Sequence, residues 1–136
     1  MKKNEKYFYQ LEMKVRDYEC DLQGVVNNAN YLHYMEHTRH ELWHHLGANF
    51  GRMHEEGIDA YVYKTTITYK KSLRSGDEFI SALSFHLKGA KLIFNQDIIS
   101  KDFNTLYAHA EVEVVTVRDG KITRGEYFAE LLKNYL

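Results

Sequence analysis

This 136-residue chain contains no proline, an absence that points to no particular function, and one cysteine, Cys20. A single cysteine cannot form an internal disulfide or a CxxC metal site, and it fits a reducing compartment. No apolar run approaches the ~18 residues that a membrane-spanning helix requires. The basic residues 1–6 are not followed by the continuous apolar stretch of a signal peptide. We therefore expect a cytoplasmic protein with no membrane partner.

The chain also lacks an excess of charge of either sign. Its formal net charge is −1, so no overall basic field indicates nucleic acid as a partner. Hydrophobic residues make up 44% of the chain and charged residues 27%, which is typical of a globular protein. The length suits one domain, and no linker, repeat or low-complexity segment divides it. We expect residues 1–136 to form a single domain.

Hydrophobic periodicity predicts one long helix and five strands. Residues 28–46 carry apolar side chains at helical spacing, and Gly47 follows as a stop signal. Alternation of polar and apolar residues predicts strands at residues 11–17, 61–70, 79–88, 92–100 and 107–117. A short helix is expected at residues 124–136, and residues between the long helix and the second strand are predicted to form a loop rich in glycine and charge. In the second strand Tyr61, Tyr63 and Tyr69 occupy odd positions, which predicts that they share one face.

This order of elements predicts an α+β fold. Short connections between successive strands imply antiparallel pairing, and the apolar face of the sheet needs a cover. The single long helix can supply that cover. We expect a curved antiparallel sheet wrapped around one helix, although the pattern does not give the strand order.

The segment 21–31 carries the features that point to chemistry. It places Asp21 on a loop just before the long helix. Backbone amides in the first turn of a helix have no intrahelical partner, and the helix dipole makes that end positive. Such a site suits the oxyanion that forms when a thioester carbonyl is attacked, and a nearby carboxylate can attack that carbonyl or draw a proton from water. The alternative is that Asp21 is a turn or capping residue, as loop aspartates often are.

Two stretches carry a resemblance to a known family. The first is Asp-x-x-Gly-Val-Val followed by Asn-Asn-Ala-Asn-Tyr from Asp21 on, continued by Tyr34-Met35-Glu36 and Arg39-His40-Glu41-Leu42. The second is Ile-Thr-Tyr-Lys-Lys-Ser-Leu-Arg-Ser-Gly-Asp from Ile67 to Asp77. Together with the order of elements they resemble the 4-hydroxybenzoyl-CoA thioesterase-like branch of the hotdog superfamily. The resemblance implies a five-stranded antiparallel sheet around one helix. It also implies a homodimer joined at edge strands, or a tetramer made of two such dimers, with active sites at the subunit boundary.

The resemblance implies roles for named residues as well. Asp21 would be the catalytic carboxylate, as nucleophile or base, and the backbone amide of Asn28 would polarise the thioester carbonyl. The expected reaction is hydrolysis of an acyl-CoA to a free acid and coenzyme A, with no metal and no organic cofactor. Residues expected to contact the substrate are Gly24, Val25, Val26, Tyr31, Tyr69, Lys70 and Arg74.

The chain departs from the family pattern at three positions. Many relatives have histidine where this chain has Asn28, and often tyrosine where it has Asp17. The Val-Asn-Asn run is similar to acyl-carrier-protein thioesterases, but these carry a histidine where this chain has Val25. Hydrolysis of acyl-carrier-protein thioesters and non-catalytic binding of acyl thioesters therefore remain alternatives. A hotdog dehydratase is a weaker one, because that chemistry uses a histidine with a carboxylate and this loop has none.

Two other features allow competing hypotheses. Four histidines at helical spacing, His33, His37, His40 and His44, could share a metal, but they lie opposite the apolar helix face and are predicted to face solvent or a partner subunit. Cys20 could act as a nucleophile only with a histidine base nearby. We expect it to be a small, partly buried residue.

Overall fold

The structure of the protein, a computed structural model, describes residues 4–136; residues 1–3, the start of the basic N-terminal segment, lie outside them. The elements follow in the order β1 (Tyr9–Lys14), a 3-10 turn (Asp17–Glu19), α1 (Asn28–His45), α2 (Phe50–Glu55), β2 (Ile58–Tyr69), β3 (Glu78–Lys88), β4 (Lys91–Ile99), β5 (Leu106–Arg118), β6 (Lys121–Ile122) and α3 (Glu126–Leu131).

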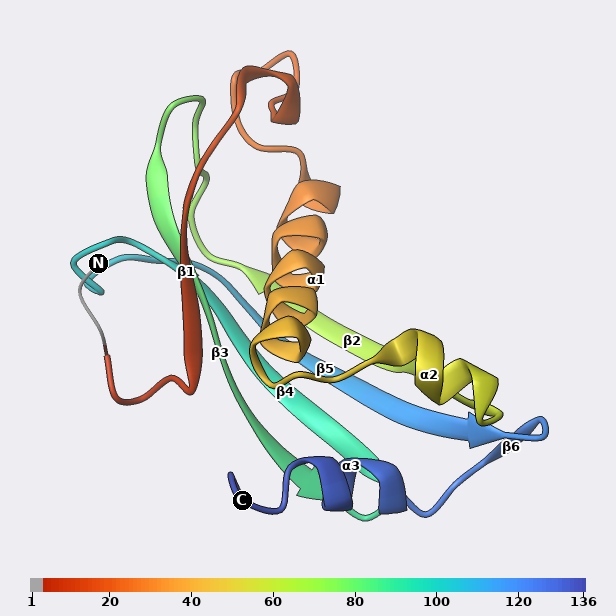
Figure 1. The fold of residues 1–136 in the computed structure, drawn as a ribbon. Helices are drawn as coiled ribbons and strands as arrows, with labels where there is room; N and C mark the ends of the chain where they lie inside the picture. Colours follow the sequence, from red (N-terminus) through yellow and green to blue (C-terminus); the bar gives the residue numbers. More distant parts are fainter. Residues whose placement is uncertain (1–3) are drawn as a thin grey trace.

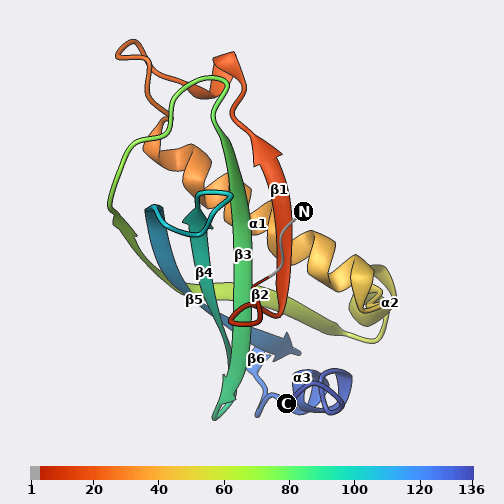
Figure 2. The same ribbon diagram turned by 90° about the vertical axis from the view of Figure 1, so that its left-hand side faces the viewer.

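The strands form one antiparallel sheet in the order β1-β3-β4-β5-β2, and the two-residue β6 pairs with β5. The sheet curves around α1, as Figures 1 and 2 show. A two-residue turn joins β3 to β4, with Lys88 opposite Lys91 and Gly89 at φ +59°, a conformation that glycine adopts without steric cost. β1 and β2 are the two edges of the five-strand path.

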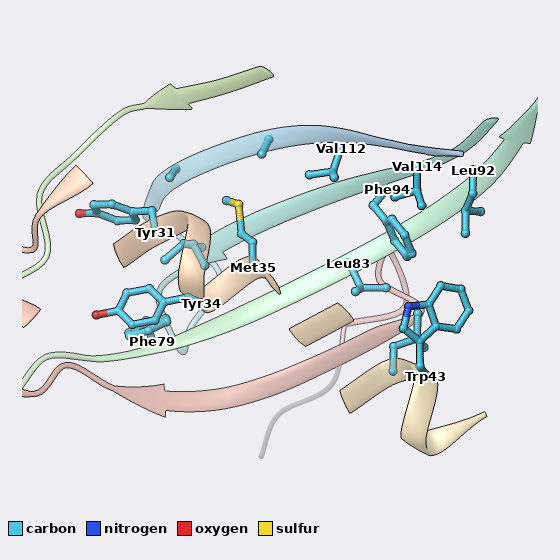
Figure 3. Packing of buried hydrophobic residues seen from close by; sticks show 14 of the residues in the cluster. Tyr31, Tyr34, Met35, Trp43, Phe79, Leu83, Leu92, Phe94, Val112 and Val114 are labelled. Carbon is cyan, nitrogen blue, oxygen red and sulfur yellow. The ribbon is translucent and has the colours of Figure 1, made fainter. Parts of the chain in front are cut away.

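The apolar face of α1 provides one side of the core. Its buried residues recur at helical spacing, and they meet apolar side chains of the sheet (Figure 3); they are Tyr31, Tyr34, Met35, Thr38, Leu42 and Trp43. Full burial of a large apolar side chain contributes roughly 1.5–3 kcal/mol. The main contacts of α1 are with β3, β4 and β1, whereas α2 lies against β2. The strip of the concave face over β2 therefore receives little cover from α1, whereas the inward residues of β5 are buried in the core.

The prediction of a five-stranded antiparallel sheet around one long helix is confirmed, and this architecture is the hotdog fold. Several boundaries moved: the first strand spans Tyr9–Lys14 and ends before a 3-10 turn, the second begins at Ile58, and the C-terminal helix is confined to Glu126–Leu131. The predicted loop after α1 is wrong in part, because it contains α2. The side chain of Asn49 caps that helix by accepting from the Arg52 amide at 2.9 Å, and Met53 is buried, so a cap and an anchor stabilise one short helix.

The prediction that the three tyrosines of β2 share a face is also wrong. A β-bulge lies between Val62 and Lys64, and it leaves Tyr63 as an extra residue. Tyr61 pairs with Val115 and Tyr69 with Ala108, which lie on opposite faces of β5, since seven positions separate them along that strand. Alternation in a sequence cannot reveal a bulge, because one extra residue shifts all that follow to the other face.

No helix within residues 4–136 combines the length and apolar character needed to cross a bilayer.

Candidate active site

The loop between β1 and α1 is fastened to the loop that precedes β3. The amide of Val26 donates to the Leu73 carbonyl at 2.9 Å, and Val25 pairs with Arg74 as an isolated bridge. Within the loop, Cys20 pairs with Val26 in the same way. These contacts bring together two segments that the sequence separates by almost fifty residues. The two stretches that carried the family resemblance are thus neighbours in space.

Asp21 lies at the tip of this loop and is exposed. Its backbone closes a turn, since its amide donates to the Val25 carbonyl at 2.9 Å and its carbonyl accepts from Gly24 at 3.0 Å. Its Oδ1 accepts from the amides of Gln23, at 2.8 Å, and Val25, at 3.4 Å. Its Oδ2 accepts no hydrogen bond from any residue that the structure describes. One carboxylate oxygen thus fixes the turn, and the other is free for chemistry.

The start of α1 offers a free backbone donor. Asn27 is the N-cap, and its side chain accepts from the Ala29 amide at 3.0 Å. The Asn30 amide donates to the Asn27 carbonyl at 2.9 Å. Between them, the amide of Asn28 has no acceptor among residues 4–136. An unpaired amide at the positive end of an 18-residue helix is suited to bind a carbonyl oxygen as negative charge develops on it.

A buried carboxylate holds the loop against the helix. Glu19 is 8% exposed, and its Oε1 accepts from the Arg16 amide at 2.8 Å and from the Tyr34 hydroxyl at 3.0 Å. Its carbonyl accepts from the Asn27 amide at 3.0 Å and from the Asn30 side chain at 2.8 Å. Burial, together with this hydrogen bond to Glu19, raises the pKa of the Tyr34 phenol far above its usual value. Glu19 therefore connects the loop to α1 only two residues before Asp21.

Tyrosines line the wall beside the helix start. Tyr31 is 3% exposed, and its hydroxyl accepts from the Leu73 amide at 3.1 Å. Its ring meets the ring of Tyr69 edge-on, at 5.5 Å between centroids. The Tyr69 hydroxyl donates to the Asn28 carbonyl at 3.2 Å and thus connects β2 to the first residue of α1. Tyr69 is half-exposed, so it presents surface to the site, whereas Tyr31 shapes the site from beneath.

The predicted cationic residues lie on the loop after β2. Lys70 and Arg74 are exposed, and the Arg74 amide donates to the Asp77 carboxylate at 2.9 Å. The Arg74 guanidinium lies beside Gly24, where a Cβ would come within 3.9 Å of its Nη1. Gly24 has φ +79°, which favours glycine at this turn. Arg74 is therefore next to the Asp21 turn. Among the predicted contact residues, Val26 is the one aliphatic side chain that is buried.

The competing hypotheses find less support in the geometry. The four histidines His33, His37, His40 and His44 are exposed on the outer side of α1, as predicted. In the described part of the chain, no three histidine, cysteine or acidic side chains are grouped so as to hold a metal. Cys20 is partly buried, also as predicted, and no hydrogen bond joins its thiol to a histidine among residues 4–136.

Sequence reasoning missed the residues that hold the site in place. Glu19 and Asn27 lie outside the predicted strand and helix, and Asn30 is in the first turn of α1, where spacing does not show that its side chain bonds the loop. Only Asn27 carried a local signal, since asparagine is a preferred N-cap. Arg39 was part of the helix pattern, but nothing in the spacing showed that its guanidinium enters the protein.

An antiparallel sheet wrapped around one helix, with a carboxylate loop leading into that helix, defines the hotdog class of α+β proteins. The profile of the Thioesterase-like superfamily matches residues 15–129, and the chain belongs to this family. It is 32% identical over 100 residues to the acyl-CoA thioester hydrolase YbgC of Escherichia coli, covering 73% of this chain and 74% of that protein. The fold matches that of a 1,4-dihydroxy-2-naphthoyl-CoA thioesterase from Synechocystis with a TM-score of 0.84 at 14% identity, covering 93% and 96% of the two chains.

A plant relative is more similar over a shorter region. The chain is 42% identical over 73 residues to a chloroplastic acyl-acyl carrier protein thioesterase of Arabidopsis thaliana. The match covers 54% of this chain and 38% of the plant protein, so the chain spans well under half the length of that relative.

Proposed function

We propose that this protein hydrolyses acyl-CoA thioesters to a free carboxylic acid and coenzyme A. The observation that carries the proposal is the free amide of Asn28 at the start of α1, preceded by the loop that exposes Asp21. The amide would accept the thioester carbonyl oxygen and stabilise the oxyanion of the tetrahedral intermediate. Asp21, through its free Oδ2, would attack the carbonyl carbon or take a proton from the attacking water. The family membership supports this reaction, since YbgC is named for it.

Residues around these two groups would bind the rest of the substrate. Gly24 allows close approach of the chain to the thioester, and Val25 and Val26 shape the turn that holds it. Tyr31 and Tyr69 would form the wall next to the carbonyl. Lys70 and Arg74 would contact phosphates of coenzyme A, since guanidinium groups bind phosphate oxygens in pairs. The proposed substrate contacts are Gly24, Val25, Val26, Tyr31, Tyr69, Lys70 and Arg74.

The test is thiol release from a panel of short, long and aromatic acyl-CoAs. Asp21→Asn removes the carboxylate but keeps an Oδ1 that can accept from the Gln23 amide, so the turn should persist. We expect at least a hundredfold loss of kcat in this variant, within the range of general acid–base catalysis. Asp119→Asn is the matched control, because Asp119 is an exposed turn residue in the β5–β6 connection. Near-normal turnover by Asp21→Asn, with the fold retained, would exclude this mechanism.

Hydrolysis in ¹⁸O-labelled water tests whether Asp21 attacks the carbonyl carbon. If it does, and water then opens the acyl-enzyme anhydride at the Asp21 carbonyl, the label enters Asp21 in the first turnover. If Asp21 acts as a base, or if water opens the anhydride at the acyl carbonyl, the label enters only the released acid. Mass spectrometry of the peptide that contains Asp21 after a single turnover reads out the label, and label in Asp21 assigns the nucleophilic role.

Acyl-carrier-protein thioesters are the second candidate substrate. The similarity to the Arabidopsis protein over 73 residues favours them. Presenting one acyl group on coenzyme A and on acyl carrier protein separates the two carriers. A higher kcat/KM for the protein-bound form would assign the carrier protein. Binding without turnover of either form would indicate a non-catalytic acyl-thioester binding module.

We also propose that two copies associate through β2. This strand is an edge of the sheet, and it exposes Tyr61, Val62 and Tyr63 at 50% or more. An exposed edge with apolar side chains is prone to pair with another strand. Sedimentation velocity on the wild-type chain and on Val62→Lys tests this, with a shift toward monomer expected for the variant. A monomeric wild-type chain would contradict it.

A further inference from the structure

A cavity of about 580 Å³ lies beside α1, away from the Asp21 loop. It is bounded by the second half of α1, by α2 and by the start of β2. Its floor consists of large apolar side chains, and charged groups surround its mouth. The apolar members are Trp43, Phe50, Met53, Ala60, Tyr61, Val62, Phe94 and Val114, of which Tyr61 and Val62 also belong to the proposed β2 contact.

One charged group enters this cavity from α1. Arg39 is largely buried, and burial lowers the pKa of its guanidinium, an effect that the nearby Glu36 partly opposes. Its Nη1 donates to Oε1 of the fully buried Gln96 at 2.9 Å, and Gln96 in turn donates to the Met35 carbonyl at 3.0 Å. The other N–H groups of Arg39 have no hydrogen-bond acceptor among residues 4–136. No carboxylate there lies within ion-pair distance of the guanidinium.

The acidic groups at the mouth have other partners. Glu36 lies 3.7 Å from the His40 ring, and Asp59 lies 2.6 Å from the His54 ring. The guanidinium is therefore the one charge in the cavity wall whose only hydrogen bond is to a neutral amide. The partly buried guanidinium therefore keeps unused donors, and the nearby Glu36 carboxylate makes no ion pair with it. An oxygen-bearing ligand would supply the missing acceptors, and its apolar part would cover the floor.

The cavity is aligned with the proposed oxyanion site. Asn28, Leu32, Arg39 and Trp43 follow one flank of α1 at spacings of four, seven and four residues. Leu32, between the two sites, is 38% exposed, and α1 gives little cover to β2 on that side. Arg39 is eleven residues beyond Asn28, or about 16 Å along the axis at 1.5 Å per residue. An extended acyl chain gains ~1.25 Å per carbon from its bond lengths and angles, so roughly a dozen carbons cover this distance.

We propose that the cavity beside Arg39 binds the far end of the acyl group and selects acyl groups that carry an oxygen acceptor there. The inference rests on the proposed thioesterase function and names its substrate class: long acyl thioesters with a hydroxyl, carbonyl or carboxylate remote from the thioester. A single aromatic ring attached to the thioester is too short to reach Arg39. The guanidinium would donate to the remote oxygen, and the acyl chain would run along the α1 flank.

The experiment compares matched pairs of acyl-CoAs. Each pair has the same chain length, from eight to sixteen carbons, and differs only in a terminal hydroxyl or carboxyl group. For the wild-type protein we expect kcat/KM to favour the oxygen-bearing member by about tenfold or more near twelve carbons, in line with a hydrogen bond to a charged donor. Arg39→Gln should lose this preference and keep its activity on short acyl-CoAs. Arg39→Lys should keep part of it, and Arg52→Gln, on the exposed face of α2, is the matched control.

A second readout does not depend on turnover. Trp43 is the only tryptophan of the chain and lines the cavity, so its fluorescence reports occupancy. Titration of Asp21→Asn with the same acyl-CoA pairs should show tighter binding of the oxygen-bearing member, and Asp21→Asn/Arg39→Gln should bind both members alike. Tighter binding of the oxygen-bearing member, with no hydrolysis by the wild type, would support the proposed role of the cavity and reject the proposed function. Asp21-dependent hydrolysis without any preference would support the function and overturn the inference.

One further outcome would also overturn it. If Arg39→Gln alters the sedimentation coefficient and leaves the wild-type substrate preference unchanged, a second copy of the chain supplies the missing acceptors. Side chains of the second copy, and not the acyl group, would then fill the cavity.

Discussion

The Asp21 loop should depend on the buried carboxylate of Glu19, and the effect on stability can be worked from the contacts. Glu19→Ala removes the acceptor for the Tyr34 hydroxyl, at 3.0 Å, and for the Arg16 amide, at 2.8 Å. Leaving a buried donor unsatisfied costs about 1–3 kcal/mol. Because Arg16 is exposed and can bond water, we expect about 2–4 kcal/mol in total. For a chain of this size that corresponds to a fall in Tm of roughly 6–15 °C.

The assay is thermal unfolding followed by circular dichroism, with a double-mutant cycle between Glu19 and Tyr34. Glu19→Gln keeps an oxygen acceptor and should lose about 1 kcal/mol, whereas Tyr34→Phe should lose about 1–2 kcal/mol. The two changes should be coupled by about 0.5 kcal/mol or more, since the side chains touch. Glu130→Ala is the control, because that carboxylate is 75% exposed and its contact with Lys133 is a surface pair.

The same variants separate stability from positioning. If the carboxylate positions Asp21, Glu19→Gln should lower kcat for thioester hydrolysis at a temperature where the variant is fully folded. A Tm for Glu19→Ala within 2 °C of wild type would refute the reasoning. So would additive effects of the Glu19 and Tyr34 changes, because additivity means that the hydrogen bond between them contributes nothing.

Three other predictions concern the rest of the fold. Gly125→Ala should destabilise the protein by about 1–3 kcal/mol in urea unfolding, since φ is +86° and a Cβ would lie 3.1 Å from the Ala90 carbonyl oxygen. Met35→Ala, at a fully buried position, should cost about 2–5 kcal/mol by the same measurement. Burial raises the folded-state pKa of Tyr7 and Tyr34, and so do their hydrogen bonds to Asp97 and Glu19 respectively. Their contribution to the free energy of unfolding is therefore complete below pH 10 and declines above it as the tyrosines of the unfolded chain ionise. Urea unfolding at pH 8 and 11 should show this loss, and the two Tyr→Phe variants should reduce it.

Periodicity predicted the elements that have one apolar face and failed where a single contact decides the conformation. The helix over Asn28–His45 repeats its apolar residues over five turns, so its type could not be mistaken. The helix over Phe50–Glu55 has little more than one turn, and it depends on the Asn49 cap. The bulge at Tyr63 has no signal in the alternation, because the residues on both sides of it still alternate.

The candidate site divides in the same way. Asp21 and Asn28 could be placed from the sequence, since both lie within a few residues of a well-defined helix start. The burial of Glu19 could not, because it results from the Tyr34 hydroxyl on α1 and from the loop that closes over it. The approach of Gly24 to Arg74 depends on pairing between segments far apart in the chain, which no local pattern describes.

The position of the proposed binding surface follows from the dimensions of the fold. Five strands at about 4.8 Å spacing make a sheet roughly 20 Å wide, whereas a helix with its side chains is about 10–12 Å across. One helix therefore covers only part of the concave face, and α1 lies over β1, β3 and β4. The strip over β2 must be covered by something else: α2 covers one end, and Tyr69 meets the helix start at the other. Between these ends most residues of β2 are exposed, so an elongated apolar ligand or a second subunit is what the geometry leaves room for. A chain that placed a second long helix over β2 would bury this strip and have no such site. Counting one long helix against five strands in the sequence thus already predicts an incomplete cover, and the structure shows that the strand left open is β2.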